Sequence, residues 1–409
     1  MAGSVPQGAP AGVRSGPGGE PESRHLVLFG AGMTGRGQVA QLAFEDGWSL
    51  TLVDRNAELV EVLHRAGAYT VRLLGERSRQ VRIAGYRVLH TSQTEALAVA
   101  VTQADLVVTS VLEPNLPEVG RLLAGALGPR LDAPAGRPLT VLAAENMSDS
   151  STVLRRHVCG HLEGRRRVAL EAGVGFPDSV IARVVPVASD PLFILTEDFS
   201  EWTADRRACV GEPPRLQGLE WVDNQAARLQ RKLFIHNAGH AVCGYLGWLR
   251  GHRLVDQAAR DPLVAAAVAQ AIAEAGEAIH REHGFAREEV RAYEENLMSR
   301  LVVDALPDDI RRVIRQPVRK LGPGERLLGP LLLCQRHGLP FAGLCRGIAA
   351  VLACRPPGDE QGKRLAGAVE RLGPVGALVE LVGYRAPADV AAALAQAWEE
   401  LARLPRAAG

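Results

Sequence analysis

The segment from His25 to Gly35 reads HLVLFGAGMTG, a short apolar run followed at once by three closely spaced glycines. The run predicts a buried strand, and the glycines match the pattern G-x-G-x-x-G that connects such a strand to a helix. The first glycine allows a tight turn, the second lets the backbone approach a pyrophosphate, and the third lets helix and strand pack closely. The predicted dinucleotide-binding turn consists of Gly30, Ala31, Gly32, Met33, Thr34 and Gly35.

A lone glycine pattern is weak evidence in a chain with 43 glycines, so its surroundings matter. The run Leu50-Thr-Leu-Val53 predicts the next strand, and Asp54 ends that strand. A carboxylate at this place binds the ribose 2′-hydroxyl and repels a 2′-phosphate, which favours NAD over NADP. Arg55 follows directly and argues the other way, since arginine accommodates that phosphate. The sequence predicts NAD as cofactor, and the alternative is a structural glycine turn in another α/β protein.

Strand-like and helix-like segments alternate through the first half of the chain. Further buried strands are predicted at 106–110 and 139–143, and a helix at 57–66. This alternation predicts an α/β fold with a Rossmann-type, doubly wound parallel sheet. From about residue 212 amphipathic stretches rich in Ala and Leu dominate, so we expect a mostly α-helical C-terminal domain. Its predicted helices cover 219–250, 261–283, 287–305, 343–355 and 388–403.

These patterns divide the chain into three parts. Residues 1–24 are rich in Gly, Pro, Ala and Ser without periodicity, and we expect a flexible leader. Residues 25–210 are predicted to form the NAD-binding Rossmann-type domain. Residues 211–409 are predicted to form a helical domain that holds the substrate and the catalytic groups.

Composition narrows the classes of partner. The chain has 409 residues, a formal net charge of +1 and six cysteines without a C-x-x-C pair. A balanced charge argues against nucleic-acid and anionic-membrane partners, because both require a cationic face. No apolar run approaches the ~18 residues of a spanning helix, and no apolar signal segment stands at the start. We therefore expect a cytoplasmic protein with reduced thiols, a small-molecule substrate, and no nucleic-acid or membrane partner.

Lysine is rare in this chain: of 47 basic residues only Lys232, Lys320 and Lys363 are lysines. Where arginine is used so freely, a lysine marks a place that a guanidinium cannot fill. A buried ammonium can lose its proton near neutral pH, whereas a guanidinium cannot. Two of the three lysines lie in the candidate functional segments.

The first candidate segment, Arg231 to His240, reads RKLFIHNAGH and predicts a helix. At about 100° per residue, Lys232, Asn237 and His240 fall within an arc of about 140° on one face. A base, a neutral hydrogen-bond donor and an imidazole on one face suit the oxidation of an alcohol. The alternative is an amphipathic helix whose polar face is simply solvated.

The same segment permits a metal alternative, because His236 and His240 are four residues apart as in H-E-x-x-H zinc helices. The glutamate of that motif is missing and no third group of ligands stands out. We therefore predict no metal.

The second candidate segment is the basic run at 311–320, which contains Arg312, Arg319 and Lys320. Such a run can clamp a sugar phosphate, and its arginines can bind the phosphate in bidentate fashion. The alternative is a solvated charged helix.

Beyond these segments, the chain resembles the polyol-specific long-chain dehydrogenases, the mannitol dehydrogenase family, from about residue 25 to about residue 397. The family signature K-x4-N-x2-H is met by Lys232, Asn237 and His240. The other matching motifs are Phe29 to Gly37, Glu145-Asn-Met147, Phe199-Ser-Glu-Trp202, Asp223-Asn224, Tyr245-Leu-Gly247, Arg315 to Leu321, Glu325-Arg-Leu327 and Gly338-Leu-Pro340.

The resemblance implies a metal-independent, NAD-linked interconversion of mannitol 1-phosphate and fructose 6-phosphate, and weakly a monomer. It implies that Lys232 is the general base and that Asn146 and Asn237 donate hydrogen bonds to the developing alkoxide. It implies that His240 contacts a substrate hydroxyl. It also implies that Arg312 and Lys320 occupy substrate-contacting positions.

The chemistry of an alcohol oxidation agrees with that assignment. A free lysine has a pKa of ~10.4 and is protonated at pH 7, so it cannot accept a proton. Burial beside other cations brings the pKa towards ~7–8, close to the operating pH. Two neutral amides stabilise a developing oxyanion without adding positive charge, and removing one such donor costs on the order of 10²-fold in turnover.

The chain departs from the family pattern at several positions. Ala182 stands where the family has an aspartate of the substrate region, and Gly329 where close relatives have a lysine. These losses keep two alternatives open: the same reaction on an unphosphorylated polyol or a hexuronate, or a catalytically inactive NAD-binding protein. Other departures are Leu112 in place of a glycine and Arg300-Leu-Val-Val-Asp304 in place of R-F-x-N-P.

Overall fold

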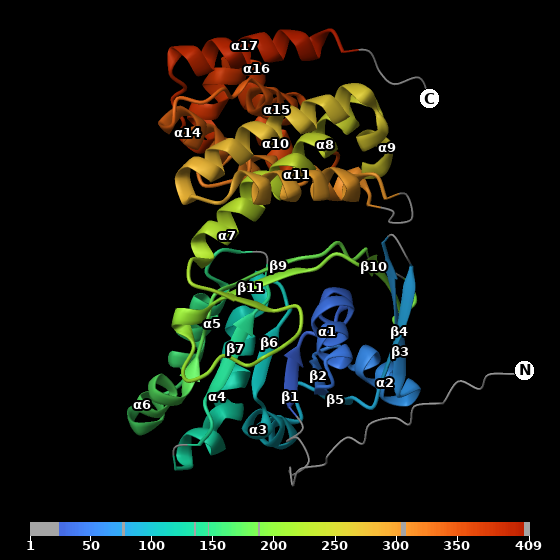
Figure 1. The fold of residues 1–409 in the computed structure, drawn as a ribbon, viewed down its shortest axis with the longest axis vertical. Helices are drawn as coiled ribbons and strands as arrows, with labels where there is room; N and C mark the ends of the chain where they lie inside the picture. Colours follow the sequence, from blue (N-terminus) through green and yellow to red (C-terminus); the bar gives the residue numbers. More distant parts are fainter. Residues whose placement is uncertain are drawn as a thin grey trace, which may run out of the picture.

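The computed structural model describes residues 24–404 except 76–77, 135, 146, 187–188 and 304–307. The predicted leader at 1–24 lies outside the described residues apart from residue 24, and so does Asn146. Figure 1 shows two bodies, one built around a sheet and one built from helices, with α7 (Gln225–Arg231) at their junction. The predicted fold class is confirmed: a Rossmann-type parallel sheet is followed by a mostly helical domain.

The main sheet has six strands in the order β5-β2-β1-β6-β7-β8, and every neighbouring pair is parallel. Counted along the chain, this is the order 3-2-1-4-5-6 of dinucleotide-binding folds. Strands β1, β2 and β5 are added towards one edge of the sheet, and β6, β7 and β8 towards the other, so the strand order reverses between β1 and β6. The carboxyl ends of these two strands therefore border the expected ligand crevice. The strands are β1 (His25–Phe29), β2 (Ser49–Asp54), β5 (Arg87–His90), β6 (Leu106–Thr109), β7 (Leu139–Ala143) and β8 (Val174–Gly175).

Both faces of this sheet are covered, which explains why its strands are apolar at nearly every position. Alternate residues of β1 enter different cores: Leu26 and Leu28 one, Val27 and Phe29 the other. The first core is completed by η1 (Gly35–Ala40, π-helical), α1 (Gln41–Glu45) and α2 (Ala57–Ala66). The second is completed by α3 (Thr94–Gln103), α4 (Leu116–Asp132), α5 (Ser150–Cys159) and α6 (Gly164–Gly173), with a short 3₁₀ turn, η2 (Glu113–Asn115), before α4.

Two three-stranded sheets flank the main one. One joins β10 (Phe193–Glu197) to the hairpin β3 (Ala68–Leu74) and β4 (Arg79–Ala84). The other has the order β12-β11-β9, and Figure 1 shows β9 and β11 between the main sheet and the helical body. Its elements are β9 (Ser179–Ala182), β11 (Glu201–Asp205), the 3₁₀ turn η3 (Arg206–Ala208) and β12 (Glu220–Val222).

The predicted helix at 219–250 is wrong over its first residues, because 220–222 form β12. This strand pairs in parallel with β11, and the tertiary pairing overrides the local helical pattern. Strands thus continue past residue 210, the predicted end of the first domain, and the helices of the second domain begin at Gln225.

The helical body is arranged around α10 (Pro262–His283), which packs against α8, α11, α14 and α15. Among the described residues α10 is the one helix long and apolar enough to cross a membrane, and here more than half of that apolar stretch is buried within the protein. The remaining helices are η4 (Lys232–His236, π-helical), α8 (Asn237–Arg250), α9 (Val255–Arg260), α11 (Arg287–Leu301), α12 (Ile310–Val313), α13 (Pro317–Lys320), α14 (Leu328–Arg336), α15 (Ala342–Ala353), α16 (Glu360–Val382) and α17 (Ala388–Ala402).

Buried ion pairs join the two bodies. Glu197 of β10 accepts two hydrogen bonds of 2.7 Å from the guanidinium of Arg300 on α11, which also stacks 3.6 Å from the ring centre of Phe199. Glu201 of β11 accepts a 2.9 Å bond from Arg231 at the end of α7. Because breaking a buried pair leaves an uncompensated charge, these contacts fix how the domains meet.

The loop after β6 carries backbone strain at Leu112. Its φ of +71° lies in the left-handed region that favours glycine, and its side chain is 73% exposed. Glu145 holds the loop in place, since its carboxylate accepts 2.8 Å bonds from the backbone N–H groups of Val111 and Leu112. The loss of the family glycine at this position is therefore tolerated at an energetic cost.

We expect Leu112→Gly to raise the free energy of unfolding by about 1 kcal/mol, because the strain it relieves exceeds the entropy that glycine adds to the unfolded chain. Urea denaturation monitored by circular dichroism measures this change. Leu112→Ala is the matched control: it removes the exposed side chain but keeps the Cβ, so it should bring no gain. Equal stability of the two variants would contradict the strain assignment.

Candidate functional site

The predicted dinucleotide-binding turn has the shape its glycines require. Gly30 has a φ of +93°, and a Cβ there would lie 2.1 Å from the carbonyl oxygen of Ser110. A Cβ at Gly35 would lie 2.3 Å from the carbonyl oxygen of Gly30. At Gly32, in contrast, a Cβ would meet nothing within 4 Å. The turn is thus packed on the protein side and open on the side where a pyrophosphate would approach.

Asp54 is tied directly to this turn. One carboxylate oxygen accepts a 2.8 Å bond from the N–H of Ala31, and the other a 2.9 Å bond from the N–H of Asn56. Arg55, which argued for NADP, forms an exposed ion pair of 3.6 Å with Glu118. The carboxylate therefore stands at the end of β2 as the predicted ribose contact.

Buried Arg36 braces the turn from below. It donates 2.6 Å bonds to the carbonyl oxygens of Ala31 and Pro191, and its guanidinium lies 4.9 Å from the ring centre of Tyr69. Met33 is half-buried beside Arg36, and Thr34 is exposed at the start of the helix. Together with Asp54, these residues hold the turn that is predicted to bind the dinucleotide.

The predicted helix at 231–240 is not a regular α-helix between Lys232 and Asn237. Lys232 to His236 form a π-helical turn, and the N–H of Asn237 donates to the carbonyl oxygen of Lys232. A turn closed from i to i+5 brings residues i and i+5 to the same side more closely than the 100° rule predicts. The spacing K-x4-N therefore equals one π-helical turn, and single π turns are frequent at functional sites.

Lys232 is only 8% exposed. Burial lowers the pKa of its ammonium to about 8; Glu201 and Glu325 oppose this change, while Arg326 and Arg300 add to it. At that pKa an appreciable fraction of the lysine is neutral and available as a base between about pH 7 and 8, whereas a free lysine is almost fully protonated there.

His236 and His240 lie on the same helical segment with ring centres 6.3 Å apart. Burial, then the charge of Arg300, lowers the pKa of His236 well below its ordinary value, so its imidazole is neutral. The Nε2 atom of His240 lies 3.0 Å from a carboxylate oxygen of Asp308. That aspartate also accepts bonds of 2.7 to 2.9 Å from Arg312, and its pKa is lowered to about 2 although burial alone would raise it.

The metal alternative has little support in this geometry. Over the described part of the chain, His, Cys, Asp and Glu side chains form no group of three that could hold a metal ion.

The predicted substrate residues lie in one basic cluster, which we define as Arg312, Arg319, Lys320 and Arg326. Lys320 is buried, its ammonium donates to the carbonyl oxygen of Val313, and burial followed by the charges of the three arginines lowers its pKa to about 7. Arg319 is exposed and donates a 3.0 Å bond to Glu325. The cluster thus contains one buried lysine and arginines that already bind carboxylates.

The two departures from the family pattern have different structural settings. A Cβ at Gly329 would lie 2.5 Å from the ring of Phe234, so this position packs helix α14 on the catalytic helix and cannot accept a lysine. Ala182 is 6% exposed at the end of β9 and pairs across the sheet with Glu201. At Gly329 there is no space for the lysine of close relatives. At Ala182 the aspartate is lost, but the neighbouring strand carries a carboxylate, that of Glu201, at the paired position.

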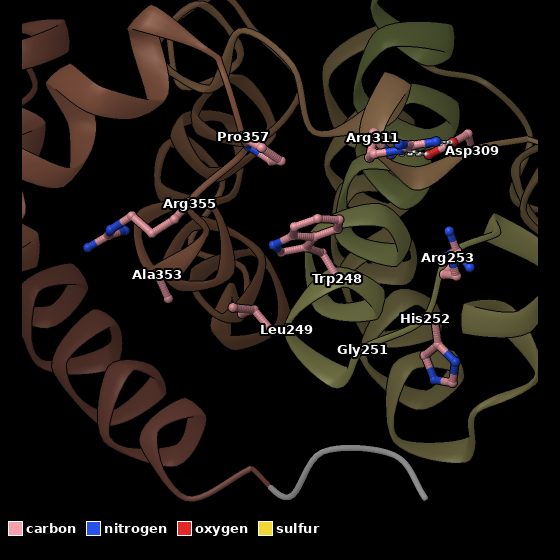
Figure 2. A pocket seen from close by; sticks show the side chains of 10 residues that line it. All are labelled: Trp248, Leu249, Gly251, His252, Arg253, Asp309, Arg311, Ala353, Arg355 and Pro357. Carbon is pink, nitrogen blue, oxygen red and sulfur yellow. Dashed lines mark hydrogen bonds and ion pairs between the residues drawn. The ribbon is translucent and has the colours of Figure 1, made fainter. Parts of the chain in front are cut away.

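Two pockets lie near these elements. One, of about 510 Å³, is at the domain boundary, and its lining includes Glu201, Arg231 and Tyr293. The other, of about 640 Å³, lies at the far end of α8, where Figure 2 shows Trp248 and Pro357 on facing sides. Neither pocket is lined by a predicted site residue, but the first includes Arg231, which directly precedes Lys232, so we assign the chemistry to the domain boundary.

Sequence reasoning gave no role to several residues that surround the predicted ones. Glu201, Glu325 and Arg326 belong to motifs that match the family, Arg300 belongs to a motif that departs from it, and Asp308 belongs to neither kind. Only contacts between segments far apart in the sequence bring them near the predicted residues. Residues of this kind are Glu201, Arg300, Asp308, Glu325 and Arg326.

A sheet with a dinucleotide turn, joined to a helical domain that buries a lysine of lowered pKa, defines a Rossmann-type oxidoreductase. The family model for the mannitol dehydrogenase Rossmann domain matches residues 24–218, and the model for the mannitol dehydrogenase C-terminal domain matches residues 227–405. The chain belongs to the mannitol dehydrogenase family. The Rossmann domain of this family binds NAD, in agreement with the predicted cofactor.

Solved structures share the whole architecture. A mannitol 2-dehydrogenase from Pseudomonas fluorescens, in a ternary complex with NAD and D-mannitol, superposes with a TM-score of 0.69 at 18% identity, covering 93% of this chain and 92% of that one. A D-sorbitol dehydrogenase in substrate-free form superposes with a TM-score of 0.76 at 17% identity, covering 93% of both chains. At these identities the similarity establishes the two-domain fold.

We expect Gly32→Ala to lower NADH affinity at least about 10-fold while leaving the melting temperature unchanged, because its Cβ meets no protein atom and projects to the open side of the turn. Titration of NADH fluorescence and differential scanning fluorimetry measure the two quantities. Gly125→Ala is the matched control, since a Cβ there also meets nothing within 4 Å but lies on α4. Undiminished affinity in Gly32→Ala would place the dinucleotide elsewhere.

Proposed function

We propose that this protein is an NAD-dependent polyol dehydrogenase that interconverts mannitol 1-phosphate and fructose 6-phosphate, the activity of a mannitol-1-phosphate 5-dehydrogenase. The observation that carries the reaction type is the buried, weakly basic ammonium of Lys232, one π-helical turn from Asn237. Oxidation of a secondary alcohol needs a base that is neutral near the working pH and a donor that holds the developing alkoxide.

In this mechanism Lys232 accepts the hydroxyl proton as the carbon–hydrogen bond breaks. The nicotinamide, when bound at the glycine turn, supplies the acceptor for the hydride. Asn237 donates a hydrogen bond to the alkoxide oxygen, and Asn146, which lies outside the described residues, is assigned the same role by its motif. His240, oriented by Asp308, contacts a further hydroxyl of the substrate. In the reverse direction protonated Lys232 returns the proton to the alkoxide.

The basic cluster supports a phosphorylated substrate. Its three arginines outnumber the two carboxylates they bind, Asp308 and Glu325, and Lys320 adds a further charge when protonated. A phosphate dianion beside Lys320 favours the charged ammonium and so strengthens its own binding. This excess of positive charge is the observation that favours the hexitol phosphate.

An unphosphorylated polyol or a hexuronate is the second candidate, and specific contacts favour it. Arg312 and Arg319 already form ion pairs, and Gly329 leaves no room for the lysine of phosphate-specific relatives. The two solved structures with the same fold are a mannitol 2-dehydrogenase and a D-sorbitol dehydrogenase, whose names indicate unphosphorylated polyols.

We expect Lys232→Ala to lower kcat at least about 10²-fold with NADH affinity unchanged, because the variant loses the base but not the glycine turn. Lys232→Arg should be nearly as inactive, since a guanidinium does not accept the proton. In the wild type, kcat for oxidation should rise with pH through about 8, where Lys232 loses its proton, and kcat for reduction should fall there. Absorbance at 340 nm monitors both directions. Wild-type turnover in Lys232→Ala would remove lysine from the base role.

The substrate is tested by comparing kcat/KM for mannitol 1-phosphate and mannitol. We expect the phosphate to be preferred at least about 10-fold, from charge-assisted hydrogen bonds to the basic cluster. Lys320→Ala should remove most of this preference, whereas Lys363→Ala, a change of an exposed lysine paired with Glu360, should keep it. A preference for mannitol would refute the phosphate assignment, and tight NADH binding without turnover of any polyol would indicate an inactive NAD-binding protein.

A further inference from the structure

Glu201 is an almost fully buried carboxylate in the domain boundary, with 9% of its surface exposed. One oxygen accepts a 2.9 Å bond from Arg231, and the other a 2.6 Å bond from the hydroxyl of Tyr293 on α11. Burial, then the charge of Glu201, raises the pKa of Tyr293 well above its ordinary value, so this hydroxyl always has a proton to donate. The carboxylate is therefore held in place by a hydrogen bond on each of its oxygens.

Glu201 lies opposite Ala182 in the sheet and is hydrogen-bonded to the residue that precedes Lys232. It is the cross-strand partner of Ala182 in the antiparallel pair β11–β9, and side chains of such partners leave the sheet on the same face. Its partner Arg231 directly precedes Lys232 in the chain. A carboxylate from the sheet domain is thus fixed beside the helical turn that carries the base.

The charges that face Lys232 come from several elements. Arg300 on α11 and Arg326 before α14 are cations, and His236 on the same turn is neutral. Glu325 is a carboxylate but already binds both Arg319 and Arg326. Among the groups that act on Lys232, Glu201 is the main source of negative charge, and it is the charge contributed by the other domain.

We propose that Glu201, the carboxylate that β11 places opposite Ala182 of β9, is the positioning residue for the base and sets how firmly Lys232 holds its proton. This inference rests on the proposed function of Lys232. Without Glu201, the surrounding cations expel the proton too readily. Lys232 would then remain a base for oxidation, but a smaller fraction of it would be protonated at neutral pH and able to serve as the acid in reduction.

The three lysines of this chain allow a direct test in the full-length protein. In protein containing [ε-¹³C]lysine, NMR gives one signal each for Lys232, Lys320 and Lys363, and single substitutions of Lys320 and Lys363 assign them. In the wild type the Lys232 signal should titrate near pH 8. In Glu201→Gln, which is isosteric, the amide oxygen still accepts from Arg231 and the amide nitrogen donates to the hydroxyl oxygen of Tyr293. In this variant the Lys232 signal should titrate about one pH unit lower, the lower end of the effect of one nearby opposite charge.

Two further measurements test the inference: the pH dependence of kcat, and the recovery of the Lys232 titration by a second substitution. The rise of kcat for oxidation should move down by the same interval in Glu201→Gln, and kcat for reduction at pH 7 should fall. Glu289→Gln is the matched control: Glu289 also pairs with Arg231, but it is half-exposed and is not among the main charges that act on Lys232. Adding Ala182→Asp to Glu201→Gln should return the Lys232 titration towards the wild-type pH.

An unchanged Lys232 titration in Glu201→Gln overturns the inference even if the enzyme is active. If Glu201→Gln does not fold, the double variants Ala182→Asp/Glu201→Gln and Ala182→Asn/Glu201→Gln differ only in charge, and equal titrations in the two overturn it as well. A shifted titration in a protein that oxidises no polyol supports the electrostatic role of Glu201 and refutes the proposed function instead.

Discussion

Burial of one ammonium group, that of Lys232, determines much of how this molecule is built. Removing a charged lysine from water costs free energy, and the protein meets that cost partly by lowering its pKa and partly by placing carboxylates near it. Too much compensation would keep the lysine protonated, and too little would keep it neutral. The balance of two carboxylates and two guanidinium groups around it is therefore the physical condition on which acid–base chemistry at this site depends.

That balance is assembled across the domain boundary, so the fold and the chemistry cannot be separated. Glu197 and Glu201 come from strands of the first body, while Arg300, Arg231 and Lys232 come from helices of the second. Glu201 and Arg300, which take part in these ion pairs, also carry charges that act on the pKa of Lys232. The glycine turn at the carboxyl end of β1 belongs to the first body and Lys232 to the second, so docking determines how the predicted cofactor-binding and proton-accepting groups lie relative to one another.

The sequence predicted what local patterns encode. The strand–turn–helix at His25 to Gly35, the acidic end of β2 and the helix at 57–66 all follow from periodicity and backbone sterics, and the structure agrees with them. It did not predict β12, because pairing with β11 outweighs a helical pattern. It also assumed 100° per residue through Lys232 to Asn237, whereas the bond from Asn237 to Lys232 spans five residues.

The partners of the catalytic groups could not be predicted in the same way, for a physical reason. Electrostatic contacts act through space and have no fixed spacing in sequence, so the influence of Glu201, Arg300 and Arg326 on Lys232 leaves no periodic signal. Asn237 and His240 were predicted because their spacing from Lys232 places them on one face of a helix. Roles that depend on tertiary placement emerge only when the two domains are seen together.

The departures from the family pattern show how such a site can change without collapse. At Leu112 the strained backbone is held by two bonds to Glu145, and at Gly329 the missing side chain is replaced by the ring of Phe234. At Ala182 the lost carboxylate has a neighbour, Glu201, on the adjacent strand. The three positions therefore differ in what surrounds them: a carboxylate holds the strained loop, an aromatic ring fills the space at Gly329, and a second carboxylate lies opposite Ala182. The effect of a departure from the family pattern thus depends on the contacts around the changed position and not on the substitution alone.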